Sequence, residues 1–187
     1  MVIINCSPKG VTGTCAKTHM LLESELLNKG ISVKSIDLNN CSKIEHCWDC
    51  GYCKRRKGCH IRDEMQMLFE IFNMEEDFVI ISPIQFDNVA PMFSIMLSRC
   101  NAIYHSKYTL NDSMIDRNKK RRIVLVLVGG SKPYKDQFPH AEHTIKFFAR
   151  AINAECDESV KIHSTDYEKP NIEEIVNEIL EKLKVKK

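Results

Sequence analysis

The chain has 187 residues, of which 43% are hydrophobic and 28% are charged, as in ordinary globular proteins. Its formal net charge of +2 excludes the strong overall field of a typical nucleic-acid-binding protein. No stretch approaches the roughly 20 apolar residues of a membrane helix, and the first residues lack the basic start and long apolar run of a signal peptide. We therefore expect one cytoplasmic domain over residues 1–187, with neither nucleic acid nor membrane as a partner.

Short β-branched runs alternate with segments of helical periodicity along the chain. In chain order, the patterns predict a strand over 2–5, a helix from 14 that ends near Gly30, a strand over 31–36, a cysteine-rich loop over about 39–61, a helix capped by Asp63, a strand over 78–81, a helix over 91–104, a strand over 123–128, a helix over 140–151, a strand over 160–162, and a helix over 172–183. Five βα units of this kind predict an open parallel sheet with helices on both faces. Ligands bind such sheets at the carboxyl ends of the strands.

The same patterns predict which side chains are buried. The first helix is expected to bury the apolar residues at near-helical spacing, which are Ala16, Met20, Leu22, Leu26 and Leu27. The basic run 119–122 directly precedes an apolar strand, and we expect it to be solvated. Five scattered cysteines are expected to pack as small hydrophobic residues, namely Cys6, Cys15, Cys41, Cys100 and Cys156.

The loop over 6–14, between the first predicted strand and helix, has the composition of an anion-binding loop. It offers hydroxyl groups at Ser7, Thr12 and Thr14, a cation at Lys9, and two glycines that let the backbone curl around a ligand. Backbone N–H groups at a helix N-terminus favour an anion. The loop lacks both the ATP-type and the dinucleotide-type glycine patterns, so it suits a terminal monophosphate. A simple βα turn with Thr14 as the helix cap is the alternative.

This loop is similar to one in a known family. Ser7-Pro8-Lys9 followed by Thr12-Gly13-Thr14 resembles the S-P-R-x-x-G-N-T loop of the NADPH-dependent FMN reductase and iron-sulfur flavoprotein branch of flavodoxin-like proteins. Further segments resemble family motifs along nearly the whole chain, namely 58–65 (G-x-C-x-x-x-D-D-M), 82–86 (S-P-V-Y-F), the glycines 129–130 after the fourth strand, and 164–166 (N-T-D). The resemblance implies a flavodoxin-like three-layer α/β sandwich, with a five-stranded parallel sheet of order 2-1-3-4-5.

The resemblance also implies FMN as the cofactor. The candidate FMN contacts are Ser7, Lys9, Thr12, Gly13, Thr14, Cys15, Pro83, Ile84, Gln85, Phe86, Asn88, Gly129 and Gly130. Gln85 replaces an aromatic residue that family members commonly place near the flavin. Ser94 and Ser98 stand where a lysine and an aspartate usually occur, whereas Arg99 is retained. No nucleophile–base pair emerges from the sequence, so no catalytic residue is assigned.

Four cysteines, Cys47, Cys50, Cys53 and Cys59, lie within thirteen residues. The overlapping C-x2-C turns let one short loop wrap three thiolates around a cubane face, and the fourth thiolate closes the site. Structural zinc sites usually draw two separated pairs of ligands, but zinc and unligated thiols remain alternatives. The spacing also matches the compact motif of iron-sulfur flavoproteins, which implies a [4Fe-4S] cluster near the FMN.

Several residues flank these cysteines. The basic residues 55–57 would offset a negative cluster, meet the 2′-phosphate of NADPH, or simply form solvated surface. Trp48 would shield the cluster, lie at a subunit contact, or pack in the ordinary way. We expect His46 and His60 at the surface.

Together these features predict an FMN-dependent oxidoreductase that takes reducing equivalents from NAD(P)H or ferredoxin and passes them on. One alternative is a non-enzymatic electron carrier. Another is a metal- or thiol-based binding module that has lost its flavin. The resemblance further implies a homodimer or homotetramer with FMN near an interface.

Overall fold

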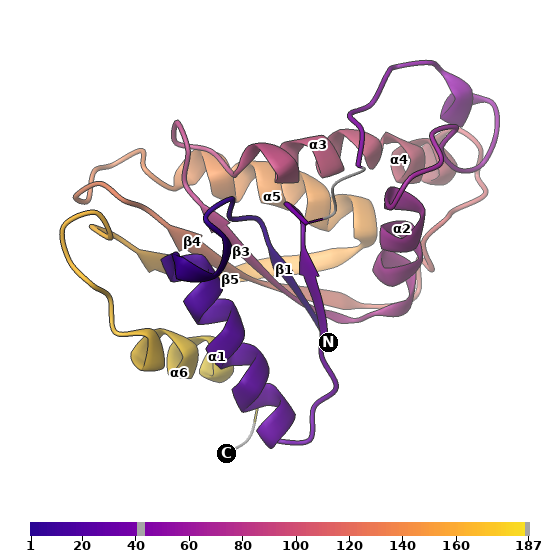
Figure 1. Ribbon diagram of the computed structural model, residues 1–187. Helices are drawn as coiled ribbons and strands as arrows, with labels where there is room; N and C mark the ends of the chain where they lie inside the picture. Colours follow the sequence, from indigo (N-terminus) through magenta and orange to yellow (C-terminus); the bar gives the residue numbers. More distant parts are fainter. Residues whose placement is uncertain (41–43, 186–187) are drawn as a thin grey trace.

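The computed structural model describes residues 1–40 and 44–185, and it contains one parallel sheet of five strands (Figure 1). The strands are β1 (Val2–Asn5), β2 (Lys34–Asp37), β3 (Asp77–Pro83), β4 (Arg121–Val128) and β5 (Ala154–Ile162). Their order is β2-β1-β3-β4-β5, and every neighbouring pair is parallel. The predicted sheet and its order are therefore confirmed.

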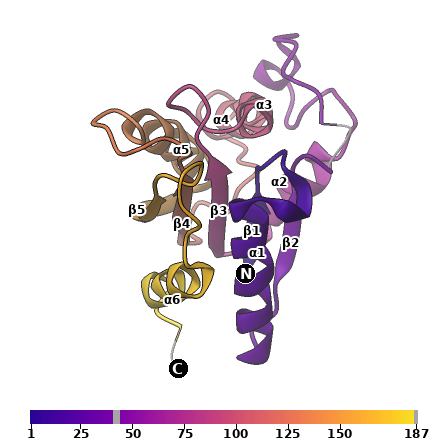
Figure 2. The same ribbon diagram turned by 60° about the vertical axis from the view of Figure 1, so that its left-hand side comes forward.

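Helices cover both faces of the sheet, as predicted (Figures 1 and 2). One face packs against α1 (Thr14–Asn28) and α6 (Ile172–Lys182). The other face packs against α2 (Met65–Met74), α3 (Pro91–Arg99), α4 (Asn101–Tyr108) and α5 (Pro139–Ile152). The central strands β1, β3 and β4 are buried on both faces, which explains their continuous runs of β-branched and other apolar residues. No helix in the described residues is long and apolar enough to cross a membrane.

Two predicted elements have different bounds in the structure. The single helix expected over 91–104 is two helices, because the regular α3 ends at Arg99 and α4 begins again after Cys100. The last strand, β5, has nine residues rather than the three predicted. It is an edge strand with a β-bulge opposite Arg122 and Val124, and its alternating acidic side chains hide it from an apolar pattern search.

Burial also differs from the prediction at three residues. Met20 and Leu27 of α1 are exposed, because the buried stripe of that helix runs through Cys15, Leu22 and Leu26 instead. Arg121, expected in solvent, is buried. Its guanidinium donates to the carbonyl oxygens of residues 73, 116, 119 and 152 at 2.6–3.1 Å, which gives hydrogen-bond partners to carbonyl groups at the ends of α2 and α5 and in the loop before β4. Among the scattered cysteines, Cys6, Cys15, Cys100 and Cys156 are buried as expected, whereas Cys41 lies outside the described residues.

Candidate functional site

An open cleft of about 720 Å³ lies at the carboxyl ends of β1, β3 and β4. Backbone hydrogen bonds hold these strand ends in register, since Cys6 N–H donates to Ile81 O at 2.9 Å and Ile84 N–H donates to Val128 O at 2.8 Å. The cleft brings together ten of the predicted FMN contacts, namely Ser7, Lys9, Thr12, Gly13, Thr14, Cys15, Pro83, Ile84, Gln85 and Gly130. Its size falls within the usual range for small-molecule and cofactor sites.

Local hydrogen bonds shape the loop between β1 and α1. The side chain of Asn5 accepts the Ser7 N–H at 3.1 Å, and the Ser7 hydroxyl accepts the Lys9 N–H at 3.3 Å. Gly10 has a positive φ of 55°, so the chain reverses there before the short turn η1 (Gly10–Thr12). A Cβ on Gly13 would lie 3.0 Å from the Lys9 Cβ, which keeps that position small. The loop therefore curls back on itself beside the cleft.

The N-terminus of α1 opens into this cleft. A simple βα turn would have Thr14 as the helix cap, but the N-cap residue is Gly13. Gly13 provides no side-chain hydrogen bond. The first N–H groups of the helix thus have no side-chain cap to bind them, while Gly13, Thr14 and Cys15 line the cleft. Lys9, Lys17 and Lys169 also line it, against the single carboxylate of Asp166. The charges and the helix dipole together favour an anion.

The opposite wall comes from the loops after β4 and β5. Ser131, Thr165, Asp166 and Lys169 line it, and none of these was among the predicted contacts. Backbone bonds join the two loops, since Thr165 N–H donates to Gly129 O and Asp166 N–H donates to Gly130 O, both at 3.2 Å. The resemblance of 164–166 to a family motif was the one signal in the sequence that pointed to this wall.

Three predicted contacts lie outside the cleft lining. Phe86 is fully exposed at the tip of a tight turn, where residues 86 and 87 both have positive φ and Gln85 pairs with Asn88. The Asn88 side chain accepts from Thr144 Oγ1 at 3.0 Å, on α5. Gly129 is buried behind the cleft, with its N–H bound to Ile162 O at 2.7 Å. The Tyr134 hydroxyl donates a hydrogen bond to the Asp87 carboxylate, which also holds this turn.

Cys15 is a buried thiol in the wall of the cleft. It is 3% exposed, and this burial raises its pKa to about 11, although a hydrogen bond with Ser7 acts in the opposite direction. A thiol with such a pKa stays protonated at neutral pH. Cys15 therefore offers the cleft a packed S–H group and no nucleophile.

The four cysteines of the C-x2-C-x2-C-x5-C motif line a second, much smaller cavity of about 30 Å³. They lie on what we call the cysteine loop, residues 44–61, above α4 and the end of α3 (Figure 1). Burial raises the pKa of the Cys53 thiol, and the neighbouring thiols of Cys47, Cys59 and Cys50 raise it further. Within the described residues, no three His, Cys, Asp or Glu side chains form a group that could hold a metal ion as they stand.

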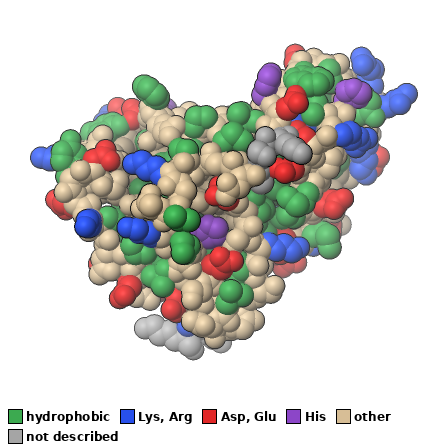
Figure 3. Space-filling model, in the orientation of Figure 1, with side chains coloured by type: hydrophobic (Ala, Val, Ile, Leu, Met, Phe, Trp, Pro, Cys, Tyr) green, Lys and Arg blue, Asp and Glu red, His purple; other side chains and the backbone are tan. Residues whose placement is uncertain are grey.

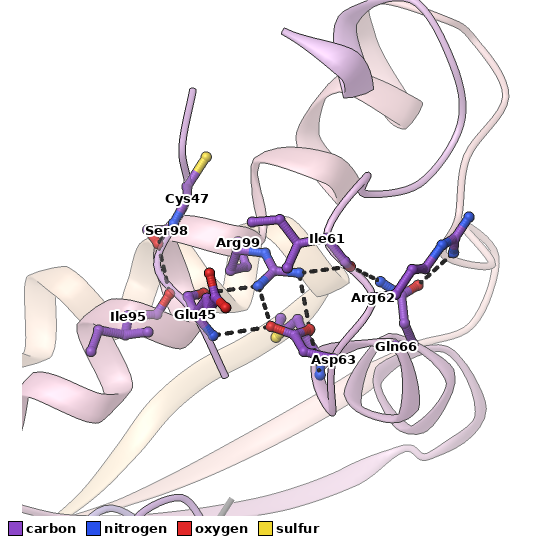
Figure 4. Close-up of polar contacts among 10 residues, drawn as sticks. Glu45, Cys47, Ile61, Arg62, Asp63, Gln66, Ile95, Ser98 and Arg99 are labelled. Carbon is purple, nitrogen blue, oxygen red and sulfur yellow. Dashed lines mark hydrogen bonds and ion pairs between the residues drawn. The ribbon is translucent and has the colours of Figure 1, made fainter. Parts of the chain in front are cut away.

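Helix α3 anchors both ends of the cysteine loop (Figure 4). The Ser98 hydroxyl accepts the Cys47 N–H at 3.1 Å, and Arg99 donates to Glu45 O at 2.8 Å and to Ile61 O at 3.2 Å. Arg99 also forms a two-pronged ion pair with Asp63, at 2.6 and 3.1 Å. Burial alone would raise the pKa of Asp63, but the hydrogen bonds from Arg99 and from the Glu45 and Met65 N–H groups, with the Arg99 charge, together lower that pKa.

Asp63 serves the loop and the next helix together. Its carboxylate accepts the Glu45 N–H at 3.0 Å and the Met65 N–H at 3.1 Å. The N-cap position of α2 is Glu64, one residue later than predicted, but Asp63 binds the first N–H group of that helix while it also binds Arg99. The retained arginine and the substituted Ser98 are thus both contacts of the cysteine loop rather than of the cleft.

Basic side chains gather over the cysteine loop, at the upper right of Figure 3. Lys57 pairs with Asp112 at 2.6 Å and Lys54 with Asp49 at 3.9 Å. Arg55 and Arg56 are exposed, as are Trp48, His46 and His60. Trp48 and His60 also line the cysteine cavity, and the His60 ring lies 5.3 Å from that of Tyr52.

Comparison with known proteins gives a consistent result. No family model matches the chain. An iron-sulfur flavoprotein of Archaeoglobus fulgidus is 30% identical over 66 residues, which are 35% of this chain and 34% of that protein. The chain thus aligns with about a third of that relative's length. The resemblance to iron-sulfur flavoproteins stated above is confirmed over this part of the sequence.

Solved structures settle the architecture. A general stress protein of Treponema denticola in complex with FMN has a TM-score of 0.63 at 16% identity, covering 98% of this chain and 97% of its own. An azoreductase from Bacillus anthracis has a TM-score of 0.69 at 14% identity, covering 97% and 94%. The protein has a flavodoxin-like fold. In this fold the strand order reverses between β1 and β3, and the cleft lies at that switch point.

Proposed function

We propose that this protein is an FMN-dependent oxidoreductase and that the cleft is its FMN site. The observation that carries the proposal is the meeting of an uncapped helix N-terminus, a curled loop and three lysines in one cleft of about 720 Å³. The fold relatives include a protein solved with FMN, and the sequence relatives are named flavoproteins. Bound FMN would supply hydride and electron-transfer chemistry, which the protein's own side chains lack.

The residues of the cleft divide into two functional ends. The backbone N–H groups of 13–15, with the Ser7 and Thr14 hydroxyls and Lys9, would hold the terminal phosphate. Pro83, Ile84 and Gln85 would lie along the ring, opposite Gly130 and Ser131. Gln85 offers an amide where a stacking aromatic residue is common, so it would bind a ring edge by hydrogen bonds.

We further propose that the cysteine loop holds a [4Fe-4S] cluster. The donor set fits, because four cysteines line one cavity and each iron of a cubane takes its own thiolate. A single tetrahedral zinc ion would instead need the four cysteine sulfurs about 3.8 Å from one another, because each Zn–S bond is about 2.3 Å long. The cavity of about 30 Å³ holds little more than one water molecule, so the cysteine side chains must turn outward to admit a cluster.

The two sites share no lining residue. The cleft is lined by residues from the loop that precedes α3 in the chain, whereas the cysteine cavity is lined by residues at the end of α3 and on α4. We propose NAD(P)H or ferredoxin as the electron donor and a homodimer or homotetramer as the assembly. Arg55 and Arg56 of the cysteine loop are exposed, so their positive charges would attract an anionic electron donor to this loop.

Flavin titration tests the first proposal. FMN and riboflavin differ only by the phosphate, so Lys9→Gln is expected to weaken FMN binding about fivefold, for a loss of about 1 kcal/mol. Riboflavin binding is expected to stay unchanged. Lys29→Gln, on the exposed end beyond α1, is the matched control. A wild-type protein that binds neither flavin, in titrations followed by fluorescence quenching, would refute the proposal.

Anaerobic reconstitution tests the second proposal, with iron and acid-labile sulfide counted per chain. Uptake of a cluster by the wild type, and its loss in Cys50→Ser, is expected. With both cofactors in place, oxidation of NAD(P)H with an acceptor separates an enzyme from an electron carrier. A carrier would exchange electrons with ferredoxin and reduce no small-molecule acceptor.

A further inference from the structure

Arg99 is a buried cation in the wall of the cysteine cavity. It is 1% exposed, and it lines the cavity together with all four cysteines of the motif. Burying a charge is costly unless the charge is paired and hydrogen-bonded. Asp63 balances one unit of charge, and two carbonyl oxygens accept from the same guanidinium. Arg99 is thus a buried, ion-paired cation beside four cysteines.

The donors of Arg99 are not all used within the described residues. An arginine has five N–H bonds, and the four contacts described above all come from its two terminal nitrogens. The Nε atom is buried and has no hydrogen-bond partner in the part of the chain that the structure describes. Cys59 lines the same cavity as Arg99. A buried donor without an acceptor, beside a cavity lined by sulfur, points to a ligand in that cavity.

We propose that Arg99 is a positioning residue for the iron-sulfur cluster. Its terminal nitrogens hold both ends of the cysteine loop on α3, and its Nε–H donates to the Cys59 sulfur or to a cluster sulfide. The inference rests on the proposed function, since it requires that the cysteines bind a cluster. Hydrogen bonds to sulfur set cluster potentials, and a donor here stabilises the more negative, reduced state.

Three variants test the role. Arg99→Lys keeps the charge but loses the planar fork of the guanidinium. A lysine ammonium group cannot bind both ends of the cysteine loop at once. Arg99→Gln with Asp63→Asn removes both charges and leaves no buried ion unpaired. Arg121→Gln is the control, because Arg121 is about as buried as Arg99 and has an unpartnered Nε, but it binds carbonyl oxygens at the ends of α2 and α5, away from the cysteine cavity.

Two readouts are independent of enzyme activity. Retention of the cluster against an iron chelator is expected to weaken about tenfold or more in both Arg99 variants, as for other supporting contacts of metal ligands. The midpoint potential is expected to fall in the double variant because the hydrogen bond from Nε to sulfur is lost. The expected fall is about 59 mV, which is a tenfold lower ratio of reduced to oxidised cluster at a fixed poise for a one-electron couple. Arg121→Gln is expected to change neither value. FMN binding at the separate cleft reports that each variant is folded.

The outcomes distinguish the two proposals. A wild type that takes up no iron and sulfide overturns the cluster and, with it, the role of Arg99. A wild type that loads a cluster while the folded double variant retains it equally, at the same potential, overturns the role of Arg99 alone. If the variants do not fold, the wild-type protein tests the role of Arg99. The Arg99 Nε–H signal in its ¹⁵N spectra is expected to shift or broaden when the cluster is loaded. An Arg99 signal unchanged by loading overturns the proposal.

Discussion

The carboxylate of Asp166 lies against the backbone of Gly130, on the wall of the cleft. A Cβ added to the glycine would overlap that carboxylate and lie 2.7 Å from the Asp166 Cγ. The Asp166 N–H also donates to the Gly130 carbonyl at 3.2 Å, so the two loops cannot simply separate. This contact fixes how the loop after β5 closes one side of the cleft.

Gly130→Ala is therefore expected to push the Asp166 side chain toward the cleft and to weaken FMN binding. Overpacking of this kind costs about 1–3 kcal/mol, or roughly five- to a hundredfold in affinity. Titration with FMN measures the effect. Adding Asp166→Ala removes the overlap and is expected to restore binding. If Gly130→Ala binds FMN as well as the wild type, residues 130 and 166 do not border the flavin.

The thiols of the flavin-free, cluster-free protein are expected to react with iodoacetamide in an order set by exposure. Cys50 is exposed, whereas burial raises the pKa of Cys15 to about 11 and that of Cys100 to about 12. Only thiolates react, so Cys50 should be modified first at pH 8 while Cys15 and Cys100 stay intact. Peptide mass spectrometry after timed quenching measures the order. Early modification of Cys15 would show that the loop after β1 opens in solution.

Lys107 binds the end of α5 from inside the protein. It is 2% exposed, and its ammonium group donates to the carbonyl oxygens of Arg150 and Ala151, both at 3.0 Å. Lys107→Met keeps the apolar stem and leaves these carbonyls unsatisfied, so we expect a loss of about 2–3 kcal/mol in the free energy of unfolding. Urea denaturation measures it. Lys29→Met, at an exposed position, is expected to change stability by less than about 0.5 kcal/mol.

Glu75 links the N-terminus to the edge strand. Its carboxylate binds Lys34 at 2.8 Å and the Met1 ammonium at 3.3 Å, and these contacts, the Lys34 bond first, lower its pKa below the ordinary 4.5. Because the folded state binds this proton less readily than the unfolded chain, the stabilisation is present above pH 4.5 and is lost as the pH falls through the lowered pKa.

Glu75→Gln is expected to cost about 1 kcal/mol at pH 7, and the difference from the wild type should shrink toward zero in acid. Urea denaturation at a series of pH values measures this difference. A constant difference down to pH 3 would assign the effect to packing rather than to charge.

Local patterns in the sequence were sufficient for the order of elements and for the sheet. Continuous apolar runs such as Ile123–Val128 have few alternatives to a strand buried on both faces, and the βα alternation then dictates parallel strands. The loop 6–14 was also predictable, because its hydroxyl groups, cation and glycines lie next to one another in the chain. The edge strand β5 was largely missed because one face and one edge are solvated, so its polar residues resemble a loop.

Tertiary structure alone decided which distant residues meet. Asp166 reaches the cleft only because β5 ends beside β4, and Arg121 is buried only because four carbonyl oxygens from three other segments surround it. Arg99 follows the same rule, since it lies some forty to fifty residues from the cysteines with which it lines one cavity. Sequence spacing records neighbours along a chain, whereas the cost of burying a charge depends on every group that packs around it. The loop after β1 was therefore predictable, and its opposite wall was not.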